Sequence, residues 1–372
     1  MNFGVLLLAW LVCLPGLAAP YPRTVVDLAG REVLIKAAPQ RIVLQDSNDL
    51  LLLALLEREQ PLARVVGWNN ALENSDPSLW RQVAGRWPQA RQIVPLQFTS
   101  SQVDIEAILR RRPDLIVARL QLRAAIESTV LYSVLKHLDI PLVYVDTEAD
   151  PLVNVLRSVE LLGLVLNQSV HADAFVQDYR QQLAHLLRRT RHLPPRRVFI
   201  EVRAGQAGNH ECCHTQGQTA WGLMIQALGA ENVGSRYLRS PSGSVALETL
   251  IRARPDVYLM TGTQRLRNGV AAIGFGHDVE QSSITRHMHR LMARRGFAAV
   301  AAGPGACIGG LHHQFYNSVF NVVGLHYLAQ AIWPQDLADL DPQALYRQTL
   351  TRYTTLPAEA PFVFAARACF AN

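Results

Sequence analysis

Lysine is almost absent from this chain of 372 residues. The basic residues are nearly all arginines, Lys36 and Lys136 are the only lysines, and the positive charges are scattered although the net charge is +6. The chain has no basic tract and no low-complexity segment, which argues against a nucleic-acid partner. It also lacks a G-x-S-x-G element and a C-x-x-C pair, and we expect no helix of the H-E-x-x-H type. These absences argue against a secreted hydrolase or thiol oxidoreductase.

Long hydrophobic runs are lacking too, except for a short one at the start. Residues 4–14 are apolar, Pro15 breaks the run, and small residues follow it. This pattern is typical of a secretory signal peptide and is too short for a comfortable membrane span. We therefore expect residues 1–19 to be removed and the mature protein to be periplasmic. The remaining 372 − 19 = 353 residues are enough for two domains.

Cysteines are few, but their number after this cleavage is even. Removal of Cys13 leaves Cys212, Cys213, Cys307 and Cys369 in an oxidising compartment. Disulfides are therefore expected. The sequence leaves open all three ways of pairing four cysteines.

A repeated segment gives the strongest indication of the fold. Residues 103–117 and 245–259 both read as a short helix, an Arg-Pro-Asp stop and an apolar strand. The register is kept without a gap, since 248 − 106 = 142 and 256 − 114 = 142. A repeat of this length predicts two similar lobes that face each other across a ligand cleft.

Strand and helix patterns alternate on both sides of a long central segment. The first part has a hairpin at 25–33, then strands at 41–44, 65–68, 115–118 and 141–146 and helices at 49–56 and 131–138. The second part has strands at 197–201 and 297–301, a helix at 220–228, and closing helices from residues 318 and 342. Such alternation is typical of α/β lobes with mostly parallel sheets.

The central segment, residues 151–193, has helical periodicity with no internal Gly-Pro break. It predicts a single long helix that could reach roughly 50 Å, from one lobe to the other. The expected fold is therefore α/β, with two Rossmann-like lobes at 20–150 and 194–372 joined by this helix.

These features resemble the iron-chelate and vitamin B12 class of periplasmic substrate-binding proteins of ABC importers. The resemblance covers essentially the whole mature chain. It rests on export, the two lobes, the paired E-x5-R-P-D element, and the run His312-His313-Gln-Phe-Tyr316-Asn-Ser318. The run is most similar to the iron-complex branch, where the serine is usually followed by proline; here Val319 takes that place. The resemblance implies a monomeric binding protein, not an enzyme, with no intrinsic cofactor.

The resemblance also implies a docking role for one glutamate in each lobe. Glu106 and Glu248 match the family's lobe-tip glutamates, which form salt bridges with arginines of the permease dimer in the inner membrane. Two equivalent acidic residues suit a symmetric partner. The alternative is that each glutamate only stabilises the first turn of its helix.

Ligand-binding candidates follow the predicted strands, because ligands of α/β sheets lie beyond the carboxyl ends of the strands. Guanidinium groups there suit carboxylate, catecholate or propionate oxygens, although any one arginine could simply be solvated. The candidates are Trp68, Arg119, Arg203, His210, Glu211, His214, Arg265, His277, His312, His313 and Tyr316.

The segment from His210 to His214 contains four side chains of metal-ligating types, including Cys212 and Cys213. It would suit a soft or borderline ion if the thiolates were free. In an exported protein a disulfide is favoured, between the adjacent cysteines or with Cys307 or Cys369. The histidines would then serve as polar cleft contacts, and whether any of them touches metal stays open.

A second cluster, His312, His313 and Tyr316, follows a glycine-rich run at 303–310 that we expect to be a flexible loop. Such a loop can approach a bulky ligand closely, and His or Tyr can enter an iron coordination sphere. The alternative is an ordinary helix start, with one imidazole as a cap.

The leading hypothesis is a protein that captures a ferric siderophore or related iron complex for an ABC permease. Haem is the nearest alternative and cobalamin the next. A bare zinc or manganese carrier is less favoured, because we expect no helix that carries a pair of metal-binding histidines and no other closed metal site, and a secreted thiol enzyme is least favoured.

Overall fold

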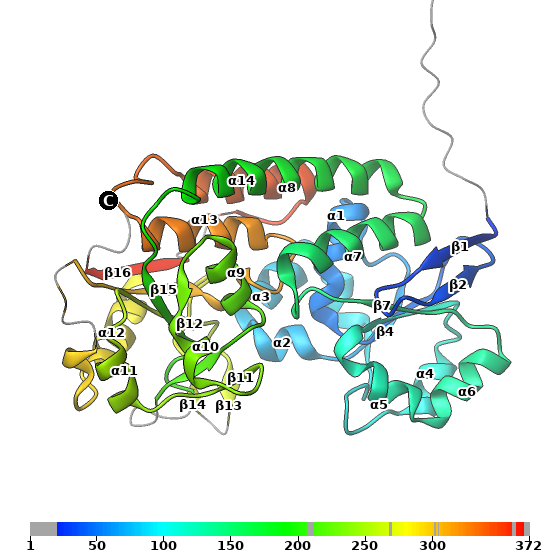
Figure 1. The fold of residues 1–372 in the computed structure, drawn as a ribbon. Coiled ribbons are helices and arrows are strands. Elements are labelled where there is room, and N and C mark those ends of the chain that lie inside the picture. Colours follow the sequence, from blue (N-terminus) through cyan, green and yellow to red (C-terminus); the bar gives the residue numbers. More distant parts are fainter. Residues whose placement is uncertain are drawn as a thin grey trace, which may run out of the picture.

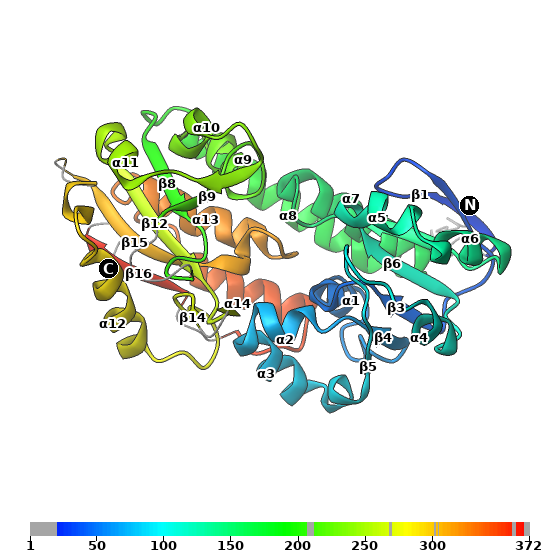
Figure 2. The same cartoon turned by 90° about the horizontal axis from the view of Figure 1, so that it is seen from below.

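The computed structural model describes residues 21–206, 212–267, 270–300, 303, 305–358 and 362–367. Two five-stranded sheets form the centres of two lobes, and helices connect them along one side (Figures 1 and 2). The predicted α/β fold with two lobes is confirmed. The expected signal peptide, residues 1–19, lies outside the described residues. None of the helices within the described ranges has the length and apolar character needed to cross a membrane.

The N-terminal lobe contains a wholly parallel sheet, as its near-continuous apolar strands predict. Its order is β5 (Val94–Pro95), β4 (Val65–Trp68), β3 (Ile42–Leu44), β6 (Leu115–Arg119), β7 (Leu142–Val145). The predicted hairpin is β1 (Arg23–Val26) and β2 (Glu32–Ile35), with Gly30 at φ +74° in its turn. The helices are α1 (Leu50–Leu56), α2 (Ala71–Ser75), α3 (Pro77–Arg86), α4 (Ile105–Arg110), α5 (Arg123–Glu127) and α6 (Val130–His137).

The C-terminal lobe repeats this architecture with one antiparallel edge strand. Its sheet order is β10 (Glu231–Asn232), β8 (Arg197–Glu201), β12 (Val257–Gly262), β15 (Cys307–His312), β16 (Val363–Arg367), and β16 is antiparallel to β15. Two small hairpins pair β9 (His214–Gln216) with β11 (Ser242–Ser244) and β13 (Leu266–Arg267) with β14 (Val270–Ala271). The helices are α9 (Trp221–Ala227), α10 (Val233–Tyr237), α11 (Leu247–Ala253), α12 (Gln281–Met292), α13 (Asn321–Ile332) and α14 (Pro342–Tyr353).

The prediction of a single connecting helix over 151–193 is wrong. The segment forms two helices, α7 (Pro151–Val165) and α8 (Ser169–Thr190), which pack against each other. Asn167 has φ +61° in the turn, a left-handed conformation that ends a helix. A side chain at Gly163 would collide with Ala172, so this glycine permits the close packing. The lobes are therefore bridged by α8, which contacts α1 on one side and α13 on the other.

Two predictions about residues 297–310 are also wrong. Residues 297–299 form a short 3-10 helix instead of a strand, and the glycine-rich run contains most of the buried strand β15 instead of a flexible loop. Gly309 and Gly310 lie within β15, where Gly310 approaches the ring of Phe275 so closely that a Cβ would lie 2.2 Å from it. Gly310 therefore serves close packing, which the sequence pattern does not distinguish from flexibility.

The repeated segment builds the same turn in both lobes. Arg112 and Arg254 adopt φ +47° and +46°, and each is followed by proline and an aspartate. The Asp114 carboxylate accepts hydrogen bonds from the backbone N–H groups of Gln40 and Arg41, both 2.8 Å. Asp256 accepts one from the N–H of Arg197 at 2.8 Å and also binds its guanidinium. In both lobes the aspartate therefore fixes the start of the neighbouring strand.

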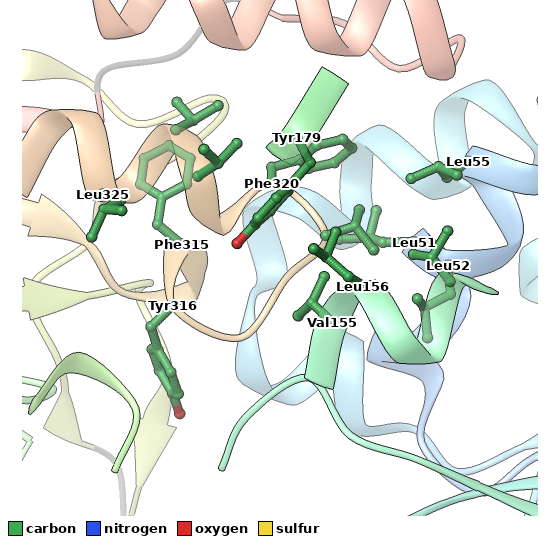
Figure 3. Close-up of a cluster of buried hydrophobic side chains, with 14 of the residues drawn as sticks. Leu51, Leu52, Leu55, Val155, Leu156, Tyr179, Phe315, Tyr316, Phe320 and Leu325 are labelled. Carbon is green, nitrogen blue, oxygen red and sulfur yellow. The ribbon is translucent and has the colours of Figure 1, made fainter. Parts of the chain in front are cut away.

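One apolar core runs under both lobes without interruption. Figure 3 shows Leu51, Leu52 and Leu55 of α1 on one side of this core and Phe315 and Leu325 of the C-terminal lobe on the other. Tyr179 of α8 lies between the two groups, and its hydroxyl donates to the Asn321 side chain at 2.7 Å. The helical side of the molecule is therefore a shared core, which favours small over large lobe movements.

We expect Asp256→Ala to reduce the free energy of unfolding by about 1–3 kcal/mol, because a backbone N–H and Arg197 lose their acceptor. Asp114→Ala should cost less, since its two N–H groups are exposed and water can replace the carboxylate. Urea unfolding followed by tryptophan fluorescence measures both. Asp173→Ala, on the exposed surface of α8, is the control and should stay within about 0.5 kcal/mol of the wild type. Equal stability of all four proteins would contradict the role given to the aspartates.

Candidate functional site

The carboxyl ends of strands from both sheets meet where the lobes face each other. Glu148 and Ala149 follow β7 of the first lobe and contact the second: Tyr316 donates to Glu148 at 3.0 Å, and Thr219 donates to the Ala149 carbonyl at 3.1 Å. We call this region, with Arg119, Arg203 and His313, the inter-lobe site. Its position agrees with the rule that ligands of parallel α/β sheets bind beyond the carboxyl ends.

On the side of the N-terminal lobe, Arg119 at the end of β6 is shared by three carboxylates. Its guanidinium lies 3.2 Å from Asp46, 3.3 Å from Asp49 and 3.4 Å from Glu148. Burial would lower the pKa of Arg119, but the three carboxylates raise it above its usual value. This arginine is therefore already neutralised by its neighbours, and the first lobe presents more negative than positive charge here.

Asp49 is the least satisfied of these carboxylates. Burial raises its pKa, Arg119 lowers it, and the negative charge of Asp46 raises it again, with a net pKa of about 6. One guanidinium group cannot balance the negative charge of three carboxylates. Asp49 is the most deeply buried of the three, and it therefore stays protonated to a higher pH than an ordinary aspartate.

On the side of the C-terminal lobe, basic groups gather around His313. Its ring is buried and its Nδ1 lies 2.9 Å from the Thr261 hydroxyl. Burial holds the pKa of His313 well below its usual value, and Arg203, His312, Arg265 and His214 lower it further. The second lobe therefore presents a neutral imidazole with two arginines and two further histidines near it.

Two nitrogens of this group lack a partner among the described residues. They are the buried Nε of Arg203 and the buried Nε2 of His313. Arg203 has φ +52°, directly after β8, and its backbone N–H lies 3.3 Å from the Thr261 hydroxyl. Buried polar atoms normally find a partner, so two such nitrogens close to one another mark a place where a ligand could bind.

Tyr316 links the two sides of the inter-lobe site. Its hydroxyl points away from the apolar cluster that holds Phe315 (Figure 3) and donates to Glu148. Burial and the nearby Glu148 raise the pKa of the tyrosine above its usual value, while Arg203 and Arg119 oppose them. The phenol and Glu148 thus connect the basic group of one lobe to the acidic group of the other.

His312 makes a second bridge between the lobes. Its Nδ1 donates to the Phe275 carbonyl at 3.1 Å, and its Nε2 lies 3.3 Å from the carboxylate of Asp76 in the first lobe. Ser75, next to Asp76, receives hydrogen bonds from Thr263 and Gln314 of the second lobe. The turn between α2 and α3 is therefore anchored on the C-terminal lobe.

The remaining ligand candidates divide into three groups. His214 is exposed, and Arg265 and His214 lie close enough to affect His313 electrostatically. Trp68 is buried, with its ring centroid 6.1 Å from that of Trp80, and His277 is buried against Phe362. Trp68 and His277 are thus enclosed by other side chains, and their part in ligand binding stays a prediction. His210 and Glu211 lie outside the described residues.

The cysteines form disulfides, as expected for an exported protein. Cys212 and Cys213 are bonded to each other, and Cys307 is disulfide-bonded too. Cys369 lies outside the described residues. The letters H-E-x-x-H do occur at 210–214, but Cys212 and Cys213 lie outside any helix and His214 begins β9, so the helical geometry of a zinc protease site is not formed there.

Glu106 and Glu248 occupy equivalent positions in the first turns of α4 and α11, and both are exposed. These helices lie on the same side of the molecule, at the outer ends of the two lobes and opposite α8 (Figure 1). Glu106 is paired with Arg110 on its own helix.

The sequence analysis missed the acidic half of the inter-lobe site. Asp46, Asp49 and Glu148 lie in the segments that follow the predicted strands at 41–44 and 141–146, so their positions were a signal. Asp76 had no such signal, because its contact with His312 depends on how the two lobes meet.

Comparison with known proteins agrees with this architecture. Residues 50–303 match the family described as periplasmic binding protein, and a search of curated proteins finds no match.

Three of the solved structures that resemble this chain illustrate the range of similar proteins. The TroA-like periplasmic binding protein FepB from Veillonella parvula has a TM-score of 0.83 and 20% identity, covering 93% of this chain and 100% of its own. The molybdate-binding protein MolA from Haemophilus influenzae has a TM-score of 0.66 and 16% identity, covering 89% and 97%. The haem-binding protein RhuT from Roseiflexus has a TM-score of 0.55 and 16% identity, covering 80% and 99%.

The family match spans more than half of the chain, so this chain belongs to the periplasmic binding protein family. The predicted membership of this class is confirmed. So is the expectation of a binding protein instead of an enzyme, because the family and the similar structures are solute-binding proteins.

We expect the stability of the protein to depend on Asp49 between about pH 4 and pH 6. In this window the folded chain keeps a proton on Asp49 that the unfolded chain releases, since an unfolded aspartate has a pKa of about 3.9. The free energy of unfolding therefore falls as the pH rises through this window. Asp49→Asn removes the titrating group, so the variant should gain about 1–3 kcal/mol on the wild type between pH 4 and pH 7.

Urea unfolding at several pH values measures this difference. Asp173→Asn is the control, because Asp173 is exposed on α8 and should give a constant offset. A constant offset for Asp49→Asn as well would show that Asp49 ionises normally.

Proposed function

We propose that this protein captures a ferric siderophore or a related anionic iron complex in the inter-lobe site and delivers it to an ABC permease of the inner membrane. The observation that carries the proposal is the group of Arg203, Arg265, His214 and His313 on one side of the site, with two buried nitrogens that lack a described partner. Guanidinium and imidazole groups suit catecholate, carboxylate or hydroxamate oxygens.

The charge distribution supports a particular orientation of the ligand. Arg119 is already paired with Asp46, Asp49 and Glu148, so the anionic oxygens would face the C-terminal lobe. The acidic first lobe would meet donor groups or the less charged side of the complex.

Haem is the second candidate, because the same cations suit its propionates, and the buried Nε2 of His313, which has no partner in the part of the chain that the structure describes, suits an iron ligand. A bare zinc or manganese ion has less support. Within the described residues, the one group of three potential metal ligands is Glu201, Cys212 and Cys213, which is not at this site.

The first experiment titrates the mature protein with ferric catecholate, ferric hydroxamate, ferric citrate, haem, cobalamin and molybdate, followed by tryptophan quenching and native mass spectrometry. We expect saturable one-to-one binding of a ferric chelate. A Soret band on loading would select haem. If the protein retained one equivalent of zinc and bound none of the titrated complexes, it would be a bare-metal carrier.

We expect Arg203→Ala to weaken binding of that chelate by about 10- to 100-fold, the effect of losing one or two hydrogen bonds to charged oxygens. The matched control is Arg290→Ala, an exposed arginine of α12 in the same lobe. Equal affinity of both variants would place the ligand elsewhere.

We further propose that Glu106 and Glu248 dock onto the permease, as their exposure at equivalent lobe ends suits a two-fold partner. The double variant Glu106→Lys, Glu248→Lys should keep its ligand affinity while uptake in cells falls at least about 10-fold. Asp173→Lys, on the opposite side of the molecule, is the control. Normal uptake with the double variant would refute this docking role.

A further inference from the structure

The disulfide between Cys212 and Cys213 lies inside the C-terminal lobe, against a buried polar network. Cys213 exchanges backbone hydrogen bonds with Val245, 3.1 and 3.0 Å, and its side chain is buried in the lobe's apolar cluster. Cys212 is partly exposed. The next residue, His214, is exposed. The two sulfurs are thus held at a fixed place, in one buried residue and one partly buried residue.

A carboxylate lies beside this pair. Glu201, the last residue of β8, is buried. The two terminal guanidinium nitrogens of Arg294 donate hydrogen bonds to its carboxylate, at 2.8 and 3.1 Å. The Tyr258 hydroxyl donates to Glu201 at 2.8 Å and lies 3.3 Å from the sulfur of Cys213. A carboxylate oxygen of Glu201 and both sulfurs lie within 4.8 Å of one another.

We propose that reduction of this disulfide opens a binding site for a thiophilic divalent cation, formed by the thiolates of Cys212 and Cys213 and the carboxylate of Glu201. The site goes beyond the proposed capture of an iron complex and does not depend on it. Two thiolates and one carboxylate within reach of a single ion are the kind of ligand set that zinc and cadmium prefer.

The redox step needs a dithiol reductant, such as the paired cysteines of a thioredoxin-like protein. One of its thiolates attacks a sulfur of the pair, the bond between Cys212 and Cys213 breaks, and the reductant closes into its own disulfide. Two electrons and two protons pass to the pair. When the cation binds, the two thiols release two protons and become thiolates.

Charge balance favours a divalent ion. Two thiolates neutralise its charge, and Glu201 remains neutralised by Arg294, so the buried group as a whole is neutral. A monovalent ion would leave one negative charge inside the lobe. Burial and Glu201 raise the pKa of Tyr258 well above its usual value, so the tyrosine stays a hydrogen-bond donor and does not become a ligand.

The test uses cadmium as the probe on the full mature protein. The protein is fully reduced with a phosphine, the excess is removed without air, and free thiols are counted. Cadmium is then titrated while the thiolate-to-metal absorbance in the ultraviolet is followed. We expect one equivalent to bind the reduced protein at least about 100-fold more tightly than the oxidised protein.

Three variants separate this site from other thiols. Cys307→Ser should keep the full signal, whereas Cys212→Ser with Cys213→Ser should lose it although the fold, checked by circular dichroism, is kept. Glu201→Gln should weaken cadmium binding by about 10-fold. The proposal is overturned if the pair stays oxidised under this treatment, if the reduced wild type takes up no cadmium, or if the double serine variant binds it equally well.

Discussion

The apolar core that the two lobes share is the constraint on which the rest of this structure depends. Helices α1, α7 and α8 meet α13 and α14 along one side of the molecule, so the two sheets are held at a fixed relation. This packing brings the carboxyl ends of β6 and β7 opposite those of β8, β12 and β15. A site between lobes needs such a support, because groups from two separate sheets can act together only if their spacing is preserved.

The inter-lobe site is electrostatically asymmetric, and this asymmetry is its most informative property. One lobe offers an arginine that three carboxylates already neutralise, and the other offers two arginines and two further histidines near an uncharged imidazole. Tyr316 and Glu148 join the two halves. Buried polar atoms are costly unless they are paired, so the buried Nε of Arg203 and Nε2 of His313, which lack a hydrogen-bond partner among the described residues, suit a ligand that supplies acceptor atoms. The proposed anionic iron complex meets this requirement.

Local patterns predicted most of the elements, and the errors have physical causes. Strands at 65–68 and 197–201 match β4 and β8, because continuous apolar runs between polar turns leave little choice. The break between α7 and α8 was missed because Leu166, Asn167 and Gln168 fit a helical pattern, and only the conformation of Asn167 ends it. The glycines of β15 were taken for a loop, because the sequence does not reveal the aromatic ring that packs on them.

By itself, the sequence indicated the family through its resemblance to known members, and it determined the two-lobe architecture and the equivalence of Asp114 and Asp256, since these follow from a short-range pattern repeated at a constant spacing. Arg203, His313 and Tyr316 were named as ligand candidates, Arg203 because it follows a predicted strand and His313 and Tyr316 because they follow a glycine-rich run, and their part in ligand binding stays a prediction. Only the tertiary structure decided that Trp68 and His277 are buried, that Arg119 is neutralised, and that Asp76 meets His312. It also decided that Glu201 and Tyr258 lie beside the cysteines. These contacts join residues far apart in the chain, and their partners are set by how sheets and lobes pack, which no local pattern encodes.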